Sequence, residues 1–186
     1  MTQAVAAPSS RTPASPPVMP LDLRRACGQF ATGVTVVTVR DGDGFRGMTA
    51  NSFTSVSLDP PLILVSVDRR NRTHQLLGEG EPFSVSVLSQ AQQCWSDRFA
   101  GRHGDVQHQF DDIPHTLSPD GMPIIAEASA SFSCRVVAIH EAGDHSLFIG
   151  QVEGIAQAPR EAPLLFFGGK YRSLHLDEET PNSGHA

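Results

Sequence analysis

Short segments rich in β-branched and apolar residues, separated by turn-forming residues, run along most of the chain. Segments 34–40 (VTVVTVR) and 45–50 (FRGMTA) flank the turn sequence DGDG, which predicts a β-hairpin. Segments 52–58, 62–67 and 83–88 have the alternating or wholly apolar patterns that are typical of strands. Two long β-like runs around the turn EAGDH and a last strand in PLLFFGGKYRSL bring the expected total to about seven strands.

Three short segments have helical rather than strand periodicity. Segment 21–33 places its apolar residues near one helical face, segment 71–78 begins at a possible cap, and segment 89–101 begins at a serine and ends at a glycine. Segment 102–123 has little periodicity and is expected to be a long loop. Because most of the expected strands are neighbours along the chain, the pattern favours a closed antiparallel sheet, a small β-barrel with short helices, over a βαβ array.

The 186 residues fit one globular domain with a single core. We expect this domain to span residues 21–174. The proline-rich segment 1–20 has the composition of a disordered arm, and the polar segment 175–186 that of a flexible tail.

Charge and cysteine usage exclude several classes of function. Fourteen Lys and Arg against twenty Asp and Glu give a formal charge of −6, which argues against a nucleic-acid partner. Three widely spaced cysteines form neither a disulfide framework nor a zinc motif and suit a reducing cytoplasm. No run approaches the roughly 18 apolar residues of a membrane span. Histidines and aspartates in the expected loop match no familiar ligand spacing, so we expect no metal site there: His103, His108, His115, Asp105, Asp111 and Asp112.

The stretch GMTANSFTSVSLDPPLIL sets small polar side chains beside an apolar strand. Its polar members are Thr49, Asn51, Ser52, Thr54, Ser55 and Ser57. Two interpretations stay open from spacing alone. The hydroxyls and the amide satisfy one another in turns, or they bind the edge of a planar heterocycle whose face the apolar neighbours cover.

The segment DRRNRTH lies between an apolar strand and an expected short helix. Its arginines Arg69, Arg70 and Arg72, with the hydroxyl of Thr73 and the helix N–H groups, would suit a phosphate. A solvated basic turn explains the same residues equally well.

Three single side chains are further candidates for ligand contacts. His145 follows a Gly-Asp turn at the head of a strand, where it would reach the mouth of a cleft or cap the turn. Phe99 and Tyr171 are aromatics beside glycines and would stack on a ring system or simply pack.

Five motifs, taken together in this order, make the chain resemble the flavin reductases that supply reduced flavin to two-component monooxygenases. They are FATGVTVVT, GMTANSFTSVSLDPPLILVSV, RFAG, GDHSLFIGQV and PLLFFGGKYRSL, and they cover roughly Leu21 to Leu174. The resemblance implies an FMN-binding split β-barrel of antiparallel Greek-key type. It also implies a homodimer with flavin bound near the subunit interface, and a separate monooxygenase as partner.

The resemblance further implies roles for residues within these motifs. The flavin, FMN or FAD, would contact Thr49, Ala50, Asn51, Ser52, Ser66, Val67, Arg72, Thr73 and Phe99. The nicotinamide of NADH or NADPH would contact His145 and Tyr171. No acid–base residue is expected to act in catalysis, because hydride would pass directly between the stacked cofactors.

Two other functions stay open. A barrel of the same kind that binds flavin without efficient nicotinamide oxidation would not need His145 and Tyr171. An oxidase of the pyridoxamine-phosphate type would want a more basic cleft, and Lys170 is the only lysine in the chain.

Overall fold

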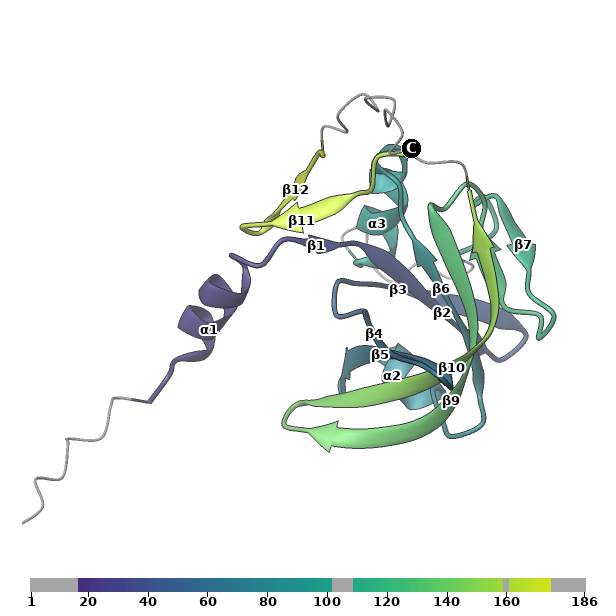
Figure 1. The fold of residues 1–186 in the computed structure, drawn as a ribbon, viewed down its shortest axis with the longest axis horizontal. Helices are drawn as coiled ribbons and strands as arrows, with labels where there is room; N and C mark the ends of the chain where they lie inside the picture. The colour runs from purple at the N-terminus through teal and green to yellow at the C-terminus, as the bar shows by residue number, and fades with distance from the viewer. Residues whose placement is uncertain (1–16, 102–108, 159–160, 175–186) are drawn as a thin grey trace, which may run out of the picture.

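A seven-stranded antiparallel sheet dominates the computed structural model, which describes residues 17–101, 109–158 and 161–174 (Figure 1). Its order is β3-β2-β6-β9-β10-β5-β4. The strands are β2 (Thr35–Asp41), β3 (Gly44–Ala50), β4 (Thr54–Leu58), β5 (Pro61–Asp68), β6 (Pro82–Val87), β9 (Ala130–Ala142) and β10 (His145–Gln157). The expectation of a mainly β, antiparallel fold is therefore confirmed.

The sheet must curl strongly, because its two edge strands are consecutive in the chain. β3 and β4 lie at opposite edges, yet only residues 51–53 connect them. From Ala50 to Thr54 an extended chain reaches about 14 Å at most. The two edges therefore approach each other at this connection. No ladder joins β3 to β4 among the described residues, so what these residues show is a curled antiparallel sheet.

Alternate residues of the curled sheet face two separate apolar clusters. On β2, Val37 and Val39 point into the main core, while Val36 belongs to the second cluster. On β5, Val65 and Val67 are both fully buried in the main core. β2 is covered on both faces and is buried at consecutive residues, whereas β5 alternates buried with half-buried residues.

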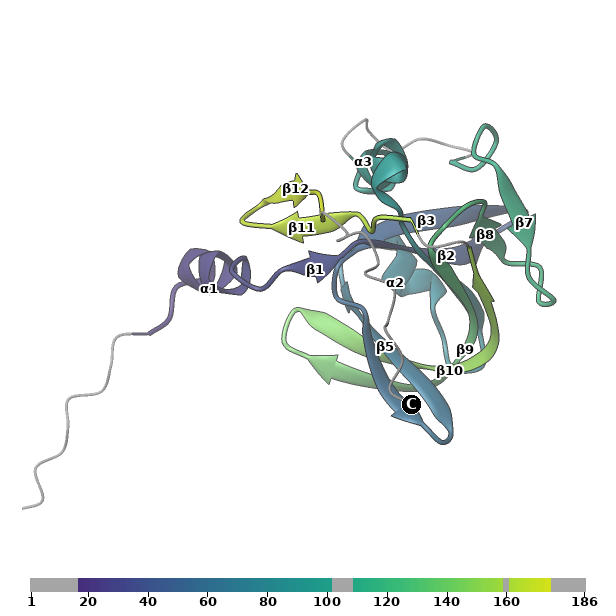
Figure 2. The same ribbon diagram turned by 45° about the horizontal axis from the view of Figure 1, so that its top comes forward.

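Short helices and two small sheets complete the fold, and some of them extend away from the large sheet (Figure 2). The helices are α1 (Pro20–Cys27), α2 (Arg72–Leu76), the 3-10 turn η1 (Gln90–Gln92) and α3 (Gln93–Phe99). A three-stranded sheet joins β1 (Thr32–Gly33), β11 (Leu165–Phe167) and β12 (Lys170–Arg172), and a two-stranded ladder joins β7 (His115–Leu117) and β8 (Pro123–Ile125). No helix in the described part of the chain is long and apolar enough to cross a membrane.

Three expectations from the sequence need correction. The last strand is in fact a hairpin, β11 and β12, because Gly168 and Gly169 adopt positive φ angles that turn the chain back. The segment expected to be an unstructured loop contains β7 and β8. The opening helix ends at Cys27, well before Gly33, and its continuation forms β1. The expected ends 1–20 and 175–186 lie mostly outside the described residues.

The imperfect alternation of segment 52–58 also has a structural cause. The pairing of β4 with β5 shifts between Ser55 and Ser57, which is a β-bulge. Val56 is the extra residue, so the apolar side chains on its two sides lose their common period.

Candidate functional site

The three-residue connection between β3 and β4 borders a cavity of 310 Å³. Its wall combines the end of β3, the end of β5, the turn before α2, the end of α3 and the head of β10. The lining residues are Met48, Thr49, Ala50, Asn51, Ser52, Ser66, Asp68, Asn71, Phe99, Ala100 and His145. We call this space the ring cavity. Seven of the eleven residues that the sequence singled out for cofactor contacts lie together here.

Two of the small hydroxyls at the ring cavity are committed to the protein itself. The Oγ of Ser52 donates to the carbonyl of Ser66 at 2.8 Å and accepts from its N–H at 3.2 Å. The Oγ1 of Thr49 donates to the carbonyl of Ser96 at 2.6 Å. Asn51 is exposed, and its amide has no partner within the described residues. Some groups of this polar stretch therefore hold the chain in place, and others face the cavity.

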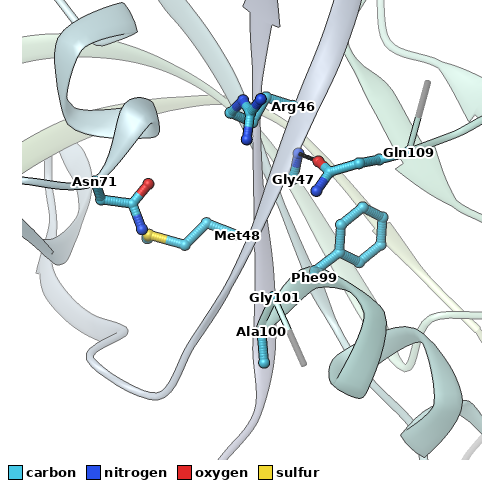
Figure 3. Close-up of a pocket in the computed structure, with 8 residues that line it drawn as sticks. All are labelled: Arg46, Gly47, Met48, Asn71, Phe99, Ala100, Gly101 and Gln109. Carbon is cyan, nitrogen blue, oxygen red and sulfur yellow. Dashed lines mark hydrogen bonds between the residues drawn. The ribbon is translucent and has the colours of Figure 1, made fainter. Parts of the chain in front are cut away.

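A second cavity of 240 Å³ continues from the first and shares four residues with it: Met48, Asn71, Phe99 and Ala100. Arg46, Gly47, Gly101 and Gln109 complete its lining (Figure 3). We call this space the side cavity. Gly47 is required at its wall, because a Cβ there would come within 2.3 Å of the Phe99 ring.

His145 stands at the mouth of the ring cavity. The two-residue turn between β9 and β10 brings it opposite Asp68 in the antiparallel register of β10 with β5. Its Nδ1 lies 2.8 Å from the Oδ1 of Asp144, and this hydrogen bond lowers the pKa of the Asp144 carboxyl. The side chain is 41% exposed, so one edge of the ring remains open to a ligand.

Asp68 carries a firm negative charge at the same mouth. The guanidinium of Arg70 contacts both of its carboxylate oxygens, at 3.1 and 2.7 Å. This hydrogen bonding holds the pKa of Asp68 well below its usual range.

A comparison with known families decides the assignment of this cavity-bearing sheet. The model of the flavin reductase like domain matches residues 27–175, which is most of the chain. The chain belongs to the flavin reductase family. An NADH-dependent flavin reductase of Rhodococcus sp is 43% identical over 164 residues, covering 87% of this chain and 90% of that protein.

Two further relatives of this flavin reductase chain bear on its function. The reductase subunit HsaB of a flavin-dependent monooxygenase from Rhodococcus jostii is 35% identical, covering 87% of this chain and 82% of that protein. The structure of the Streptomyces globisporus NADH:FAD oxidoreductase SgcE6 is similar with a TM-score of 0.79 and 42% identity. It covers 88% of this chain and 100% of that one.

The arginines expected to hold a phosphate are each paired with a carboxylate in the flavin reductase fold. Arg72 donates to Asp41 at 2.8 Å, which lowers the pKa of Asp41. Arg69 lies 3.5 Å from Glu141, and Arg70 is bound to Asp68 as described above. These pairings favour the solvated-turn interpretation for the three guanidiniums.

Three other residues expected to touch a cofactor lie outside both cavities. The side chain of Val67 is part of the main core, on the face of β5 opposite Ser66. Thr73 is fully buried, and its Oγ1 has no partner among the described residues. Tyr171 lies on β12, where its hydroxyl is 2.8 Å from the Oγ of Ser96 and donates to Asp97 at 3.2 Å.

Several lining residues were not singled out from the sequence. Asn71 had a detectable signal as the cap of α2, and Asp68 lay in the segment considered for phosphate. Gln109 had none, because it lies in a stretch without periodicity and meets β3 only through the tertiary fold. Of the possible metal ligands, His103, Asp105 and His108 lie outside the described residues, and the described residues contain no cluster of three such groups.

Proposed function

We propose that the chain is an NADH-dependent flavin reductase that transfers a hydride to FMN or FAD and supplies reduced flavin to a separate monooxygenase. The observation that carries this proposal is the ring cavity. It gathers residues 49–52 from one segment with Ser66, Phe99 and His145 from three others. The relatives named NADH-dependent flavin reductase and monooxygenase reductase subunit support the same assignment.

The residues of the ring cavity fit a flavin ring. Met48, Ala50, Phe99 and Ala100 offer apolar surface to its faces, and the Asn51 amide offers both a donor and an acceptor to its polar edge. A bound flavin would supply the hydride acceptor, and a reduced nicotinamide would supply the donor. Such a site needs no strongly acidic or basic catalytic side chain.

The chain's own residues would hold and orient the flavin and the nicotinamide. The Ser52 link to Ser66 fixes the crossing segment against β5, so that Asn51 is presented to the cavity in one position. We assign His145 to the nicotinamide, because it is held by Asp144 at the open mouth where a second ligand would enter above the first. Either nicotinamide nucleotide would fit this role, and the relatives favour NADH.

A flavin-binding protein without efficient nicotinamide oxidation remains the second candidate. His145 and Tyr171 were the residues expected to separate the two functions. Tyr171 binds Ser96 and Asp97 away from the cavity, so the nicotinamide role depends on His145 alone.

We also propose that the curled sheet is the split β-barrel of the family and that two copies form a homodimer in the cytoplasm. The helix α1 supports the dimer, because it projects away from the body in both views and none of its residues is buried (Figures 1 and 2). An isolated helix of eight residues is marginal in water. A second copy would give its apolar residues a packing partner.

The test is a steady-state assay of the purified full chain with each flavin and each reduced nicotinamide nucleotide. The expected result is flavin-dependent loss of the reduced-nicotinamide absorbance, faster with NADH than with NADPH. Flavin binding without any oxidation of either nucleotide would favour the second candidate instead.

A further inference from the structure

The wall of the ring cavity that α3 provides is held from outside the cavity. Phe99 and Ala100, at the end of α3, line both cavities (Figure 3). The helix has only seven residues, and a helix of this length takes its stability from tertiary contacts rather than from its own hydrogen bonds. The contacts that hold α3 therefore determine where this wall lies.

Ser96 is the residue of α3 on which two cavity residues depend. Its backbone carbonyl accepts a hydrogen bond from the N–H of Ala100 at 3.0 Å and another from the Oγ1 of Thr49 at 2.6 Å. Ala100 and Thr49 both line the ring cavity, one from α3 and the other from β3. A shift of Ser96 would therefore displace the cavity wall on two elements at once.

The side chain of Ser96 is bound in turn by the hairpin of β11 and β12. Ser96 is fully buried, and its Oγ lies 2.8 Å from the hydroxyl of Tyr171. That hydroxyl donates to the Oδ1 of Asp97 at 3.2 Å. Because a carboxylate only accepts, the tyrosine proton belongs to this second bond and the Ser96 hydroxyl donates to the tyrosine oxygen. One tyrosine hydroxyl thus binds two consecutive residues of α3.

The tyrosine ring is itself fixed on the hairpin. Tyr171 on β12 is paired in register with Phe166 on β11, and the two rings pack edge to face with their centroids 5.7 Å apart. Both rings also pack against the second apolar cluster, to which Phe99 belongs. The hydroxyl therefore reaches α3 from a supported position 75 residues further along the chain than Ser96.

We propose that Tyr171 is a positioning residue for the flavin. Through Ser96 it holds α3 so that Phe99 and Ala100 are already in place when the flavin ring enters. A wall that is ordered before binding favours affinity, because the ligand does not have to order it. This role replaces the nicotinamide contact expected for Tyr171 from the sequence. The inference rests on the proposed function, since it takes the ring cavity as the flavin site.

Tyr171→Phe removes the hydroxyl and keeps the ring that packs on Phe166. We expect it to raise the KM for flavin about fivefold, the loss of one hydrogen bond that orders the wall. At saturating flavin, kcat and the KM for NADH should not change, because the mouth of the cavity is untouched. The absorption spectrum of the bound flavin should move toward that of free flavin, since it reports the surroundings of the ring.

Ser96→Ala breaks the same contact from the side of α3. It should raise the KM for flavin to a similar extent, and the double variant Ser96→Ala, Tyr171→Phe should be no worse than either single variant, because all three lack the same contact. The double variant also leaves no buried serine hydroxyl without a partner. It therefore tests the proposal even if Tyr171→Phe alone fails to fold.

Ser84→Ala is the matched control. It removes another fully buried serine hydroxyl, which donates to the carbonyl of Pro123 and lies outside both cavities. Thermal unfolding should show a loss of stability in this variant as in Tyr171→Phe, whereas its KM for flavin should match that of the unsubstituted chain.

The remaining outcomes count against the proposal. It is overturned by an unchanged KM for flavin in both single variants, by the same rise in Ser84→Ala, or by additive effects in the double variant. A rise in the KM for NADH alone would make Tyr171 a nicotinamide contact and overturn it as well. If the unsubstituted chain reduces flavin and the variants match it, only this inference fails. If the unsubstituted chain reduces no flavin, the proposed function fails and this inference fails with it.

Discussion

His145, which we propose contacts the nicotinamide, is held in place by its neighbours. Asp144 holds one nitrogen of the ring, and the strand register places the residue opposite Asp68 at the cavity mouth. Because Arg70 depresses the pKa of Asp68, this carboxylate stays charged throughout the neutral and mildly acidic range. Asp68 therefore contributes a constant negative charge at the mouth under ordinary assay conditions.

Replacing this histidine should affect the nucleotide more than the flavin. We expect His145→Ala to raise the KM for NADH about fivefold, the loss of one ordinary hydrogen bond, and to leave flavin affinity nearly unchanged. Steady-state kinetics and flavin fluorescence measure the two quantities. His140→Ala, an exposed histidine on β9, is the control and should change neither. An increase confined to the flavin term would reassign His145.

At the scale of residues, the sequence motifs predicted which segments line the cavity, but not the direction in which every side chain points. Ser66 and Val67 are neighbours in one motif, yet only Ser66 reaches the cavity because consecutive strand residues face opposite sides. The position of Gln109 in the cavity wall could not be predicted from the sequence. It depends on a hydrogen bond with Gly47, which lies 62 residues away in the chain.

At the scale of elements, the connection from β3 to β4 determines the site. Three residues cross between opposite sheet edges, and Ser52 ties them to β5 through two hydrogen bonds. The polar character of this segment therefore has two causes. Ser52 and Thr49 stabilise the crossing, and Asn51 is the residue that we propose binds the flavin.

Single substitutions in this connection should separate these roles. Asn51→Ala should weaken flavin binding without changing the unfolding temperature, because the side chain is exposed and makes no described contact. Ser52→Ala should lower the free energy of unfolding by about 1 to 3 kcal/mol, because it leaves the Ser66 backbone groups without their partner. Calorimetry measures the stability of each variant, and flavin titration measures its affinity for flavin. Equal effects of the two changes on stability would refute this division.

The sequence predicted most elements of the large sheet, since their apolar periods are strong. It missed the turn between β11 and β12, because the apolar run before Gly168 and Gly169 reads as the start of one continuing strand. It also missed β7 and β8, which are three residues each and have no usable period. The order of strands in the sheet could not be predicted from the sequence pattern, because the pairing of β10 with β5 joins segments that are far apart in the chain.

At the scale of the whole molecule, the projecting α1 is the feature that one chain does not explain. Leu21 and Leu23 are each 56% exposed and Phe30 is 76% exposed, all on one extension from the body (Figure 1). A contiguous exposed apolar segment of this kind is typical of an interaction surface.

We therefore expect the full chain to sediment as a dimer and the double variant Leu21→Asp, Leu23→Asp to shift toward monomer. The added charges would oppose burial of this surface. Leu117→Asp changes an equally exposed leucine on β7, far from α1, and should leave the dimer intact. A dimer unaffected by the α1 changes would mean that the interface lies elsewhere.

The most direct measurement of the account is an experimental structure of the chain with FMN bound. It should place the flavin ring in the ring cavity, against residues 48–52 and within contact of Phe99, with His145 at the open face. A flavin ring bound at any other surface, with the ring cavity left empty, would contradict it.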